Sequence, residues 1–387
     1  MALAQSAART ATISAMEPHR IWDIFCTVVD NHGDLGVCWR LTRQLLARGQ
    51  TVRLWVDDAS ALEWMAPQAQ NMAQLLVLPW TAASQNQVLL GLPPAQVWIE
   101  AFGCCLPTPF VAHGVLSQQR LGLPAPTWIN LEYLSAESWV PGIHGLPSPV
   151  MSGPAKGWTK HFFYPGFTPE TGGLLREPDL FFAQADFSQN GHDVIWRDKH
   201  APLRASGAWL VSLFCYAPAA LVPFLKPSTS HRHHMVVPPG LPMTAMQKAL
   251  AQLDIKPRWD RLPYTDQDGF DAMLWACDLN FFRGEDSLVR AIWAGKPFVW
   301  HIYPQDDNAH HAKLKAFLEW LQAPEDLCRF HHTWNGLDQA PLPTLNTQTL
   351  QRWGNCTQQA RQRLSAQTDL VTQLIEFISL KSTSLSH

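Results

Sequence analysis

Short apolar runs alternate with segments of helical periodicity through the first half of the chain. Apolar residues recur at helical spacing from residue 36 to 48, and Gly49 follows as a helix-ending residue. The order of strand, helix and strand predicts a parallel sheet built from βαβ units. The runs of strand length are residues 21–29, 51–56, 75–78, 97–102 and 127–131.

A second series of the same kind begins near Ala208. The pattern predicts strands at 209–215, 235–237, 258–262, 278–282 and 297–301, with helical segments at 217–224, 244–253, 268–276 and 287–293 between them. The stretch 141–177, rich in Pro and Gly, predicts an irregular but ordered connection. Residues 308–321 and 350–380 are predicted to be helical.

Length and order together predict two domains. With 387 residues and 47% hydrophobic residues, the chain exceeds one ordinary core. We predict an α/β protein with two Rossmann-like domains facing each other across a cleft, which is the GT-B architecture of many nucleotide-sugar glycosyltransferases. The predicted domains are 21–200 and 201–365, followed by a helix at 366–380 that packs back on the first domain. Residues 1–20 are predicted to be a disordered tail, with Met16 as a candidate start.

Composition excludes several classes of protein. The net charge of -3 and the lack of a long basic run argue against a general nucleic-acid binder. The eight cysteines never form Cys-x-x-Cys, which argues against a zinc or redox motif and favours reduced, buried thiols. No run of 18 apolar residues predicts a membrane span, and the first 20 residues lack the apolar core of a signal peptide. We therefore expect a cytoplasmic protein.

The segment Arg283-Gly284-Glu285-Asp286-Ser287 joins a buried strand to a helix. A diphosphate at this helix N-terminus would meet unpaired N–H groups and the positive end of the helix dipole, and Arg283 could add a charged contact. The alternative is that Asp286 or Ser287 only caps the helix. Capping explains one residue but not the whole cluster, so the segment predicts a donor-binding site.

A second acidic loop contains Asp30 and Asp34. Two carboxylates would repel a pyrophosphate, which assigns this loop to the acceptor side of the cleft. Such a pair can orient a cationic or protic nucleophile and take its proton. The alternative is that Asp34 is an N-cap and Asp30 a turn residue.

Other candidate metal ligands are weaker. Asp266-Gln-Asp268 has the spacing of a metal-bound nucleotide-sugar motif, but its place before an apolar helix favours capping. His231, His233 and His234 are predicted to lie in a polar loop with no further ligand at suitable spacing. We therefore predict no metal.

Three long segments of the chain are distinctive. They are Phe25-Cys-x-Val-Val-Asp-Asn-x-Gly-Asp-Leu-Gly-Val-Cys-Trp-Arg40, Trp98-Ile-Glu-Ala-Phe-Gly-Cys104 and Arg283-Gly-Glu-Asp-Ser-x-Val-Arg-Ala-x-Trp-Ala-Gly-Lys-Pro-Phe-Val-Trp-x-Ile-Tyr-Pro-Gln-Asp-Asp307. They resemble the bacterial elongation factor P arginine rhamnosyltransferases, the EarP family, and the resemblance runs from about residue 21 to 380. This resemblance implies an inverting, metal-independent GT-B enzyme that moves rhamnose from dTDP-β-L-rhamnose to one arginine of elongation factor P.

The resemblance also implies roles for individual residues. Asp34 matches the family's general base, and Asp30 its partner in the same loop. Tyr264 stands where a phenylalanine is typical, and it can still stack on a pyrimidine. Glu285 is kept as a further candidate for the catalytic carboxylate. The residues that match the family's donor site are Phe214, Tyr216, Tyr264, Phe270, Arg283, Glu285, Asp286 and Ser287.

Two other functions remain open on the sequence. One keeps the fold but changes the reaction, to a sugar-nucleotide epimerase or a glycosyltransferase for a small molecule. The other is a noncatalytic protein that binds a nucleotide or a translation factor. The acidic pair in the first loop argues against the second.

Overall fold

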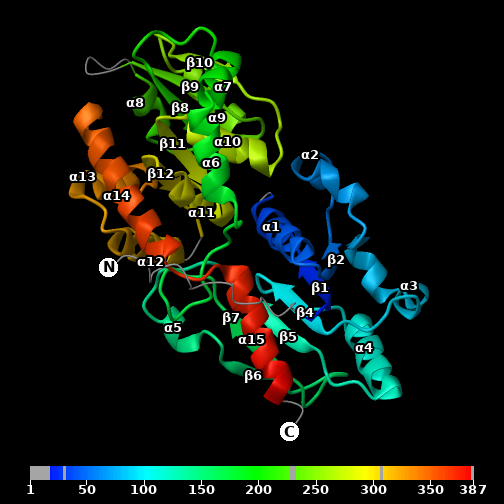
Figure 1. Ribbon diagram of the computed structural model, residues 1–387. Helices are drawn as coiled ribbons and strands as arrows, with labels where there is room; N and C mark the ends of the chain where they lie inside the picture. Colours follow the sequence, from blue (N-terminus) through cyan, green and yellow to red (C-terminus); the bar gives the residue numbers. More distant parts are fainter. Residues whose placement is uncertain (1–17, 29–31, 227–231, 306–307, 385–387) are drawn as a thin grey trace, which may run out of the picture.

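The structure is a computed structural model that describes residues 18–28, 32–226, 232–305 and 308–384. Two α/β domains, each with its own sheet, lie side by side with helix α1 between them (Figure 1). Residues 1–17 of the predicted tail, Met16 included, and Asp30 fall outside the described residues, whereas Arg20, at the end of that predicted tail, is buried.

The N-terminal domain contains a seven-stranded sheet in the order β3-β2-β1-β4-β5-β7-β6. All neighbours pair in parallel except β6, which runs antiparallel to β7. The strands are β1 (Ile21–Cys26), β2 (Thr51–Val56), β3 (Leu75–Pro79), β4 (Val97–Ala101), β5 (Thr127–Leu131), β6 (Pro147–Pro149) and β7 (Thr159–Phe163). The helices are α1 (Gly33–Ala47), α2 (Leu62–Met65), α3 (Asn86–Leu90), α4 (Thr108–Leu121) and α5 (Val140–Ile143), with 3-10 turns at Pro67–Asn71 and Trp80–Ser84.

The C-terminal domain contains a five-stranded parallel sheet in the order β10-β9-β8-β11-β12. Its strands are β8 (Trp209–Leu213), β9 (His233–Val237), β10 (Arg258–Arg261), β11 (Leu279–Arg283) and β12 (Phe298–His301). The helices from residue 180 onward are α6 (Leu180–Gln189), α7 (His192–His200), α8 (Leu221–Leu225), α9 (Leu241–Leu250), α10 (Gln267–Ala276), α11 (Glu285–Ala294), α12 (Ala309–Leu321), α13 (Glu325–Trp334), α14 (Thr347–Ser365) and α15 (Leu370–Ser384).

The predicted strands of both domains are present, and their parallel pairing confirms the α/β class. Strands β6 and β7 lie inside the stretch that was expected to be irregular. The prediction missed them because their side chains, which are mostly exposed or half-buried, give no apolar run. His233 and His234 also differ from the prediction, since they lie on β9 and not in a loop, and His234 is buried against Asp260. His231 is outside the described residues.

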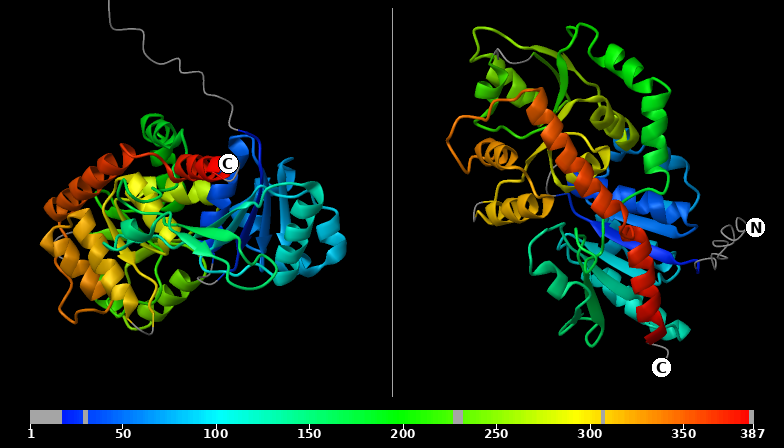
Figure 2. Two further views of the ribbon diagram at one scale, coloured as in Figure 1. Left: turned by 90° about the horizontal axis from the view of Figure 1, so that it is seen from below. Right: turned by 60° about the vertical axis from the view of Figure 1, so that its left-hand side comes forward.

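Segments near the expected boundary at residue 200 pack on the C-terminal domain. Helices α6 and α7 contact α10, and Phe181 and Trp196 join the apolar core of that domain. The last helix of the chain, in contrast, returns to the N-terminal domain. The helical stretch expected at 350–380 is two helices, of which α14 packs against α11 and α15 packs on the N-terminal core through Leu370, Leu374 and Ile378 (Figure 2).

Candidate active site

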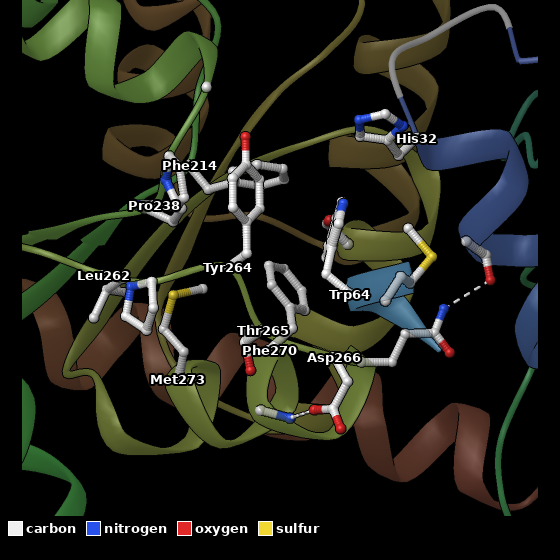
Figure 3. A pocket seen from close by; sticks show the side chains of 18 of the residues that line it. His32, Trp64, Phe214, Pro238, Leu262, Tyr264, Thr265, Asp266, Phe270 and Met273 are labelled. Carbon is white, nitrogen blue, oxygen red and sulfur yellow. Dashed lines mark hydrogen bonds between the residues drawn. The ribbon is translucent and has the colours of Figure 1, made fainter. Parts of the chain in front are cut away.

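A pocket with a volume of about 450 Å³ lies between the two domains, within the size range of ligand sites. Its floor and one wall come from the loops after β8, β9, β10 and β11, while the start of α1 and helix α2 close the opposite wall (Figure 3). The loops follow the carboxyl ends of parallel strands, where open α/β sheets bind ligands. The side chains drawn around it include Phe214, Pro238, Leu262, Tyr264, Phe270 and Met273 from the C-terminal domain and His32 and Trp64 from the N-terminal domain.

The first turn of helix α11 borders this pocket. Gly284 is its N-cap with φ 76° and ψ 171°, a conformation that is accessible essentially only to glycine. This turn directs strand β11 into the helix, so Gly284 and Ser287 both line the pocket. No side chain caps α11. Helix capping therefore does not account for Asp286 or Ser287.

Arg283 lies at the end of β11 and is 8% exposed. Its guanidinium carbon is 4.9 Å from the ring centroid of Phe214 and 4.7 Å from that of Tyr216. Cation–π contacts of this kind fix the direction of a guanidinium. The structure thus brings together three of the predicted donor-site residues, although Tyr216 is not itself a lining residue of the pocket.

His301 borders Arg283 on the next strand and was not predicted from the sequence. It pairs in register with Arg283, and its ring centroid is 5.1 Å from that of Tyr216. Burial, together with the charges of Arg283 and His310, lowers the pKa of His301 to about 3. His301 is therefore neutral at physiological pH and adds no positive charge beside Arg283.

Tyr264 and Phe270 also line the pocket (Figure 3). Tyr264 is 58% exposed, whereas Phe270 packs against the domain core and places its ring centroid 5.7 Å from that of Phe214. Phe270 is thus both a pocket residue and a core contact. Asp266 is the N-cap of α10, since its carboxylate accepts a hydrogen bond from the Gly269 amide at 2.9 Å. This confirms the predicted capping role.

Asp34 lies in the first turn of α1 and is 5% exposed. The N-cap of this helix is His32, not Asp34 as the capping alternative had it. The neighbouring Gly33 and Gly36 line the pocket, so the turn that carries Asp34 borders the same space as Arg283 and Ser287. Asp30 lies outside the described residues, and its role stays a prediction.

Glu285 connects three parts of the molecule. Its Oε2 accepts a hydrogen bond from the amide of Leu134 at 2.7 Å, and its Oε1 pairs with Nζ of Lys313 on α12. Leu134 belongs to the loop that follows β5 in the N-terminal domain. Because an amide and a cation both stabilise its charged form, this carboxylate is suited to holding the domains in position.

Asp286 faces α1 across the domain interface. Its carboxylate accepts hydrogen bonds from Nε of Arg40 at 3.0 and 3.3 Å. Burial raises the pKa of Asp286, and Arg40 opposes this rise. Arg40 also bonds Asp271 at 3.2 Å. Asp286 also lines the pocket, but its carboxylate is already paired with Arg40 of the other domain. The sequence pattern could not identify Arg40 as this partner.

The same interface contains a second buried arginine. Arg290 of α11 forms a double contact with Asp271, at 3.0 and 2.6 Å, and bonds Glu177 at 2.6 Å. Burial alone would raise the pKa of Glu177, but the charges of Arg290 and Arg40 lower it to about 2. The three carboxylates of this network therefore share two guanidinium groups inside the interface.

The chain matches the model of the elongation factor P rhamnosyltransferase EarP over residues 22–379. A protein-arginine rhamnosyltransferase of Pseudomonas putida is 41% identical over 392 residues, which cover 92% of this chain and 98% of that protein. One from Shewanella oneidensis is 36% identical and covers 92% of this chain and 97% of its own length. The chain belongs to the EarP family. The sequence-based identification is confirmed.

Solved structures agree with this assignment to the EarP family. One, described as the structural basis for EarP-mediated arginine glycosylation of translation elongation factor EF-P, has a TM-score of 0.61 and 28% identity, and the match covers 93% of this chain and 99% of that one. UGT89C1 of Arabidopsis thaliana complexed with UDP-L-rhamnose has a TM-score of 0.51 at 11% identity, which shows the shared fold. The predicted GT-B architecture is confirmed.

The described part of this EarP-family chain contains no group of three or more His, Cys, Asp or Glu side chains that could hold a metal ion. Its helices include none that is long and apolar enough to cross a membrane.

Arg283→Ala should weaken nucleotide binding in this EarP-family protein. The variant loses a charged donor at the N-terminus of α11, and a hydrogen bond to a charged group contributes about 1.5–3 kcal/mol. Isothermal calorimetry with dTDP measures the loss. Arg261→Ala, at the end of strand β10 and not among the lining residues, is the control and should bind dTDP as the wild type does. Unchanged affinity in Arg283→Ala would remove this role.

Proposed function

We propose that this enzyme is an inverting glycosyltransferase that transfers L-rhamnose from dTDP-β-L-rhamnose to an arginine side chain of elongation factor P. The observation that carries the proposal is the match of nearly the whole chain to the EarP family. Because the acceptor is a translation factor, we place the reaction in the cytoplasm, with no direct contact to nucleic acid or membrane.

The pocket supports a nucleoside diphosphate sugar as the donor. Apolar side chains of Pro238, Leu262 and Met273 line the pocket and suit the methyl group of thymine. The diphosphate would lie against Arg283 and the N-terminus of α11, where a helix attracts anions. Ser287, also a lining residue, could donate a hydrogen bond to it.

The acceptor chemistry requires a carboxylate. An arginine side chain keeps its proton to above about pH 12, so its nitrogen is a poor nucleophile. We propose that Asp34 takes this proton as the bond from the guanidinium nitrogen to C1 of rhamnose forms and the bond from C1 to the diphosphate breaks. The products are rhamnosyl-arginine and dTDP. Asp34 is not itself a lining residue, but it follows the lining residue Gly33 on α1, while Arg283 lines the pocket from the other domain, as attack opposite the leaving group requires.

Intact mass of elongation factor P after incubation with the enzyme and dTDP-rhamnose tests the function. We expect a gain of one deoxyhexose, lost when the acceptor arginine is replaced by lysine. Release of dTDP without elongation factor P would favour a small-molecule glycosyltransferase, and epimerised sugar nucleotide would favour an epimerase. Binding of dTDP with no turnover under any of these conditions would favour a noncatalytic protein.

Rhamnose transfer should survive excess EDTA. Asp266 caps α10 and Asp268 pairs with Arg43 at 2.9 Å, so the only Asp-x-Asp pair noted in the sequence has structural partners. The measurement is the initial rate with and without the chelator, with added magnesium or manganese as the control. A rate abolished by EDTA and restored by either metal would contradict the proposal.

A further inference from the structure

Trp64 lines the pocket from the N-terminal domain, the domain that carries the proposed acceptor loop. It lies on the short helix α2 of the N-terminal domain, and its half-buried side chain packs on the apolar core of that domain. The same indole lines the pocket (Figure 3). An aromatic side chain anchored in one domain thus contributes to a pocket formed largely by the other.

The indole of Trp64 contacts Tyr264 of the C-terminal domain. The two ring centroids are 5.0 Å apart with an interplanar angle of 38°. This separation lies within the range of attractive aromatic pairs. Trp64 also contacts the ring of His32 in an edge-on arrangement, with the two ring centroids 5.6 Å apart. His32 is the N-cap of α1, two residues before Asp34.

Tyr264 needs such support to serve as a binding surface. Its side chain is 58% exposed, and it lies in the loop between β10 and α10. A ring with this exposure loses side-chain entropy when a ligand fixes it, and that loss weakens binding. A neighbour that already holds the ring reduces the loss.

We propose that Trp64 is a positioning residue of the nucleoside site, which holds the Tyr264 ring from the opposite domain and so makes nucleotide affinity depend on both domains. The inference rests on the proposed donor site but not on the acceptor. Through His32, the same contact joins the nucleoside end of the pocket to the first turn of α1.

Calorimetry with dTDP on the full-length protein tests this role. Trp64→Ala should weaken dTDP binding about three- to tenfold, the range of one aromatic pair. Trp64→Phe retains a ring and should lose less than about twofold. Trp139→Ala is the matched control, because Trp139 is a 48% exposed tryptophan of the same domain outside the pocket lining, and its dTDP affinity should equal that of the wild type.

A double-mutant cycle separates a positioning role from a general structural one. In a Tyr264→Ala background, adding Trp64→Ala should cost less than about twofold in dTDP affinity, because the partner ring is already absent. Equal losses in both backgrounds would contradict the inference, as would an unchanged affinity in Trp64→Ala alone. The melting temperature of Trp64→Phe shows whether the fold is retained.

Failure of this inference is distinguishable from failure of the proposed function. The same titrations are made with UDP, and the Trp64 variants are compared with whichever nucleotide the wild type binds more tightly. A preference for UDP would contradict the proposed donor, whereas the Trp64 comparison would still decide the positioning role. Transfer to elongation factor P is measured separately and does not enter the cycle.

Discussion

Asp34→Asn should slow rhamnose transfer by roughly two to four orders of magnitude, the usual contribution of a general base. The amide has the size of the carboxylate but cannot accept the proton of the acceptor guanidinium. Asp34 is buried in the first turn of α1, and the residues around it border the pocket. Single-turnover rates with elongation factor P measure the effect, while dTDP affinity should remain that of the wild type.

Glu325→Gln is the matched control for this substitution. Glu325 is an exposed acidic residue in the first turn of α13, away from the pocket, so it repeats the loss of one negative charge at a helix start. Its transfer rate should be unchanged. A near wild-type rate in Asp34→Asn, with normal dTDP binding, would show that Asp34 is not the base and would leave Asp30 or Glu285 as candidates.

Arg40→Ala should lower the free energy of unfolding by about 3–5 kcal/mol, the usual cost of removing one partner from a buried ion pair. The Arg40 side chain is 1% exposed, and its loss leaves Asp286 without the cation that lies across the interface. Urea denaturation followed by circular dichroism measures the change, and a two-state analysis requires that both domains unfold together.

Arg43→Ala provides the comparison on the same helix. Arg43 also forms an ion pair with a carboxylate of the C-terminal domain, that of Asp268, at 2.9 Å. However, these two side chains are 24% and 66% exposed. Exposed pairs contribute about 0–1 kcal/mol, so this variant should be nearly as stable as the wild type. Equal losses in the two variants would show that burial does not determine the contribution of these interdomain ion pairs.

The loss in Arg40→Ala should depend on pH. Burial raises the pKa of Asp286 and Arg40 opposes this, so without Arg40 the pKa rises further. The folded variant then binds a proton that the unfolded chain releases, which makes its stability fall as pH rises through that interval. We expect a smaller deficit near pH 5 than near pH 8, and a deficit independent of pH would contradict this account.

Much of the fold could be predicted because parallel strands that are buried on both faces appear in the sequence as continuous apolar runs. The strands β1, β2, β4, β5 and β11 are buried almost throughout, and their limits were predicted to within a few residues. Strands β6 and β7 are partly exposed and were missed. Local periodicity reports burial on a sheet face, so strands whose side chains are mostly exposed or half-buried give little signal.

The candidate site was predictable in part for a different reason. Arg283 and Ser287 belong to one short segment at the end of a strand, and the rules for helix N-termini apply to such a segment directly. His301 and Trp64 were missed, because each looks like an ordinary core residue when only its neighbours in the sequence are considered. Their proximity to Tyr216 and Tyr264 is visible only after folding.

The sequence by itself determined the α/β class, the two domains, the family and the two loops that carry the candidate chemistry, since each depends on residues close together in the chain. Only the tertiary structure decided how the domains meet. Arg40 and Asp286 are 246 positions apart, yet they form a buried ion pair, and Asp286 thereby faces α1 as well as the pocket. Contacts of this kind depend on the relative placement of whole elements, which local patterns of polar and apolar residues do not specify.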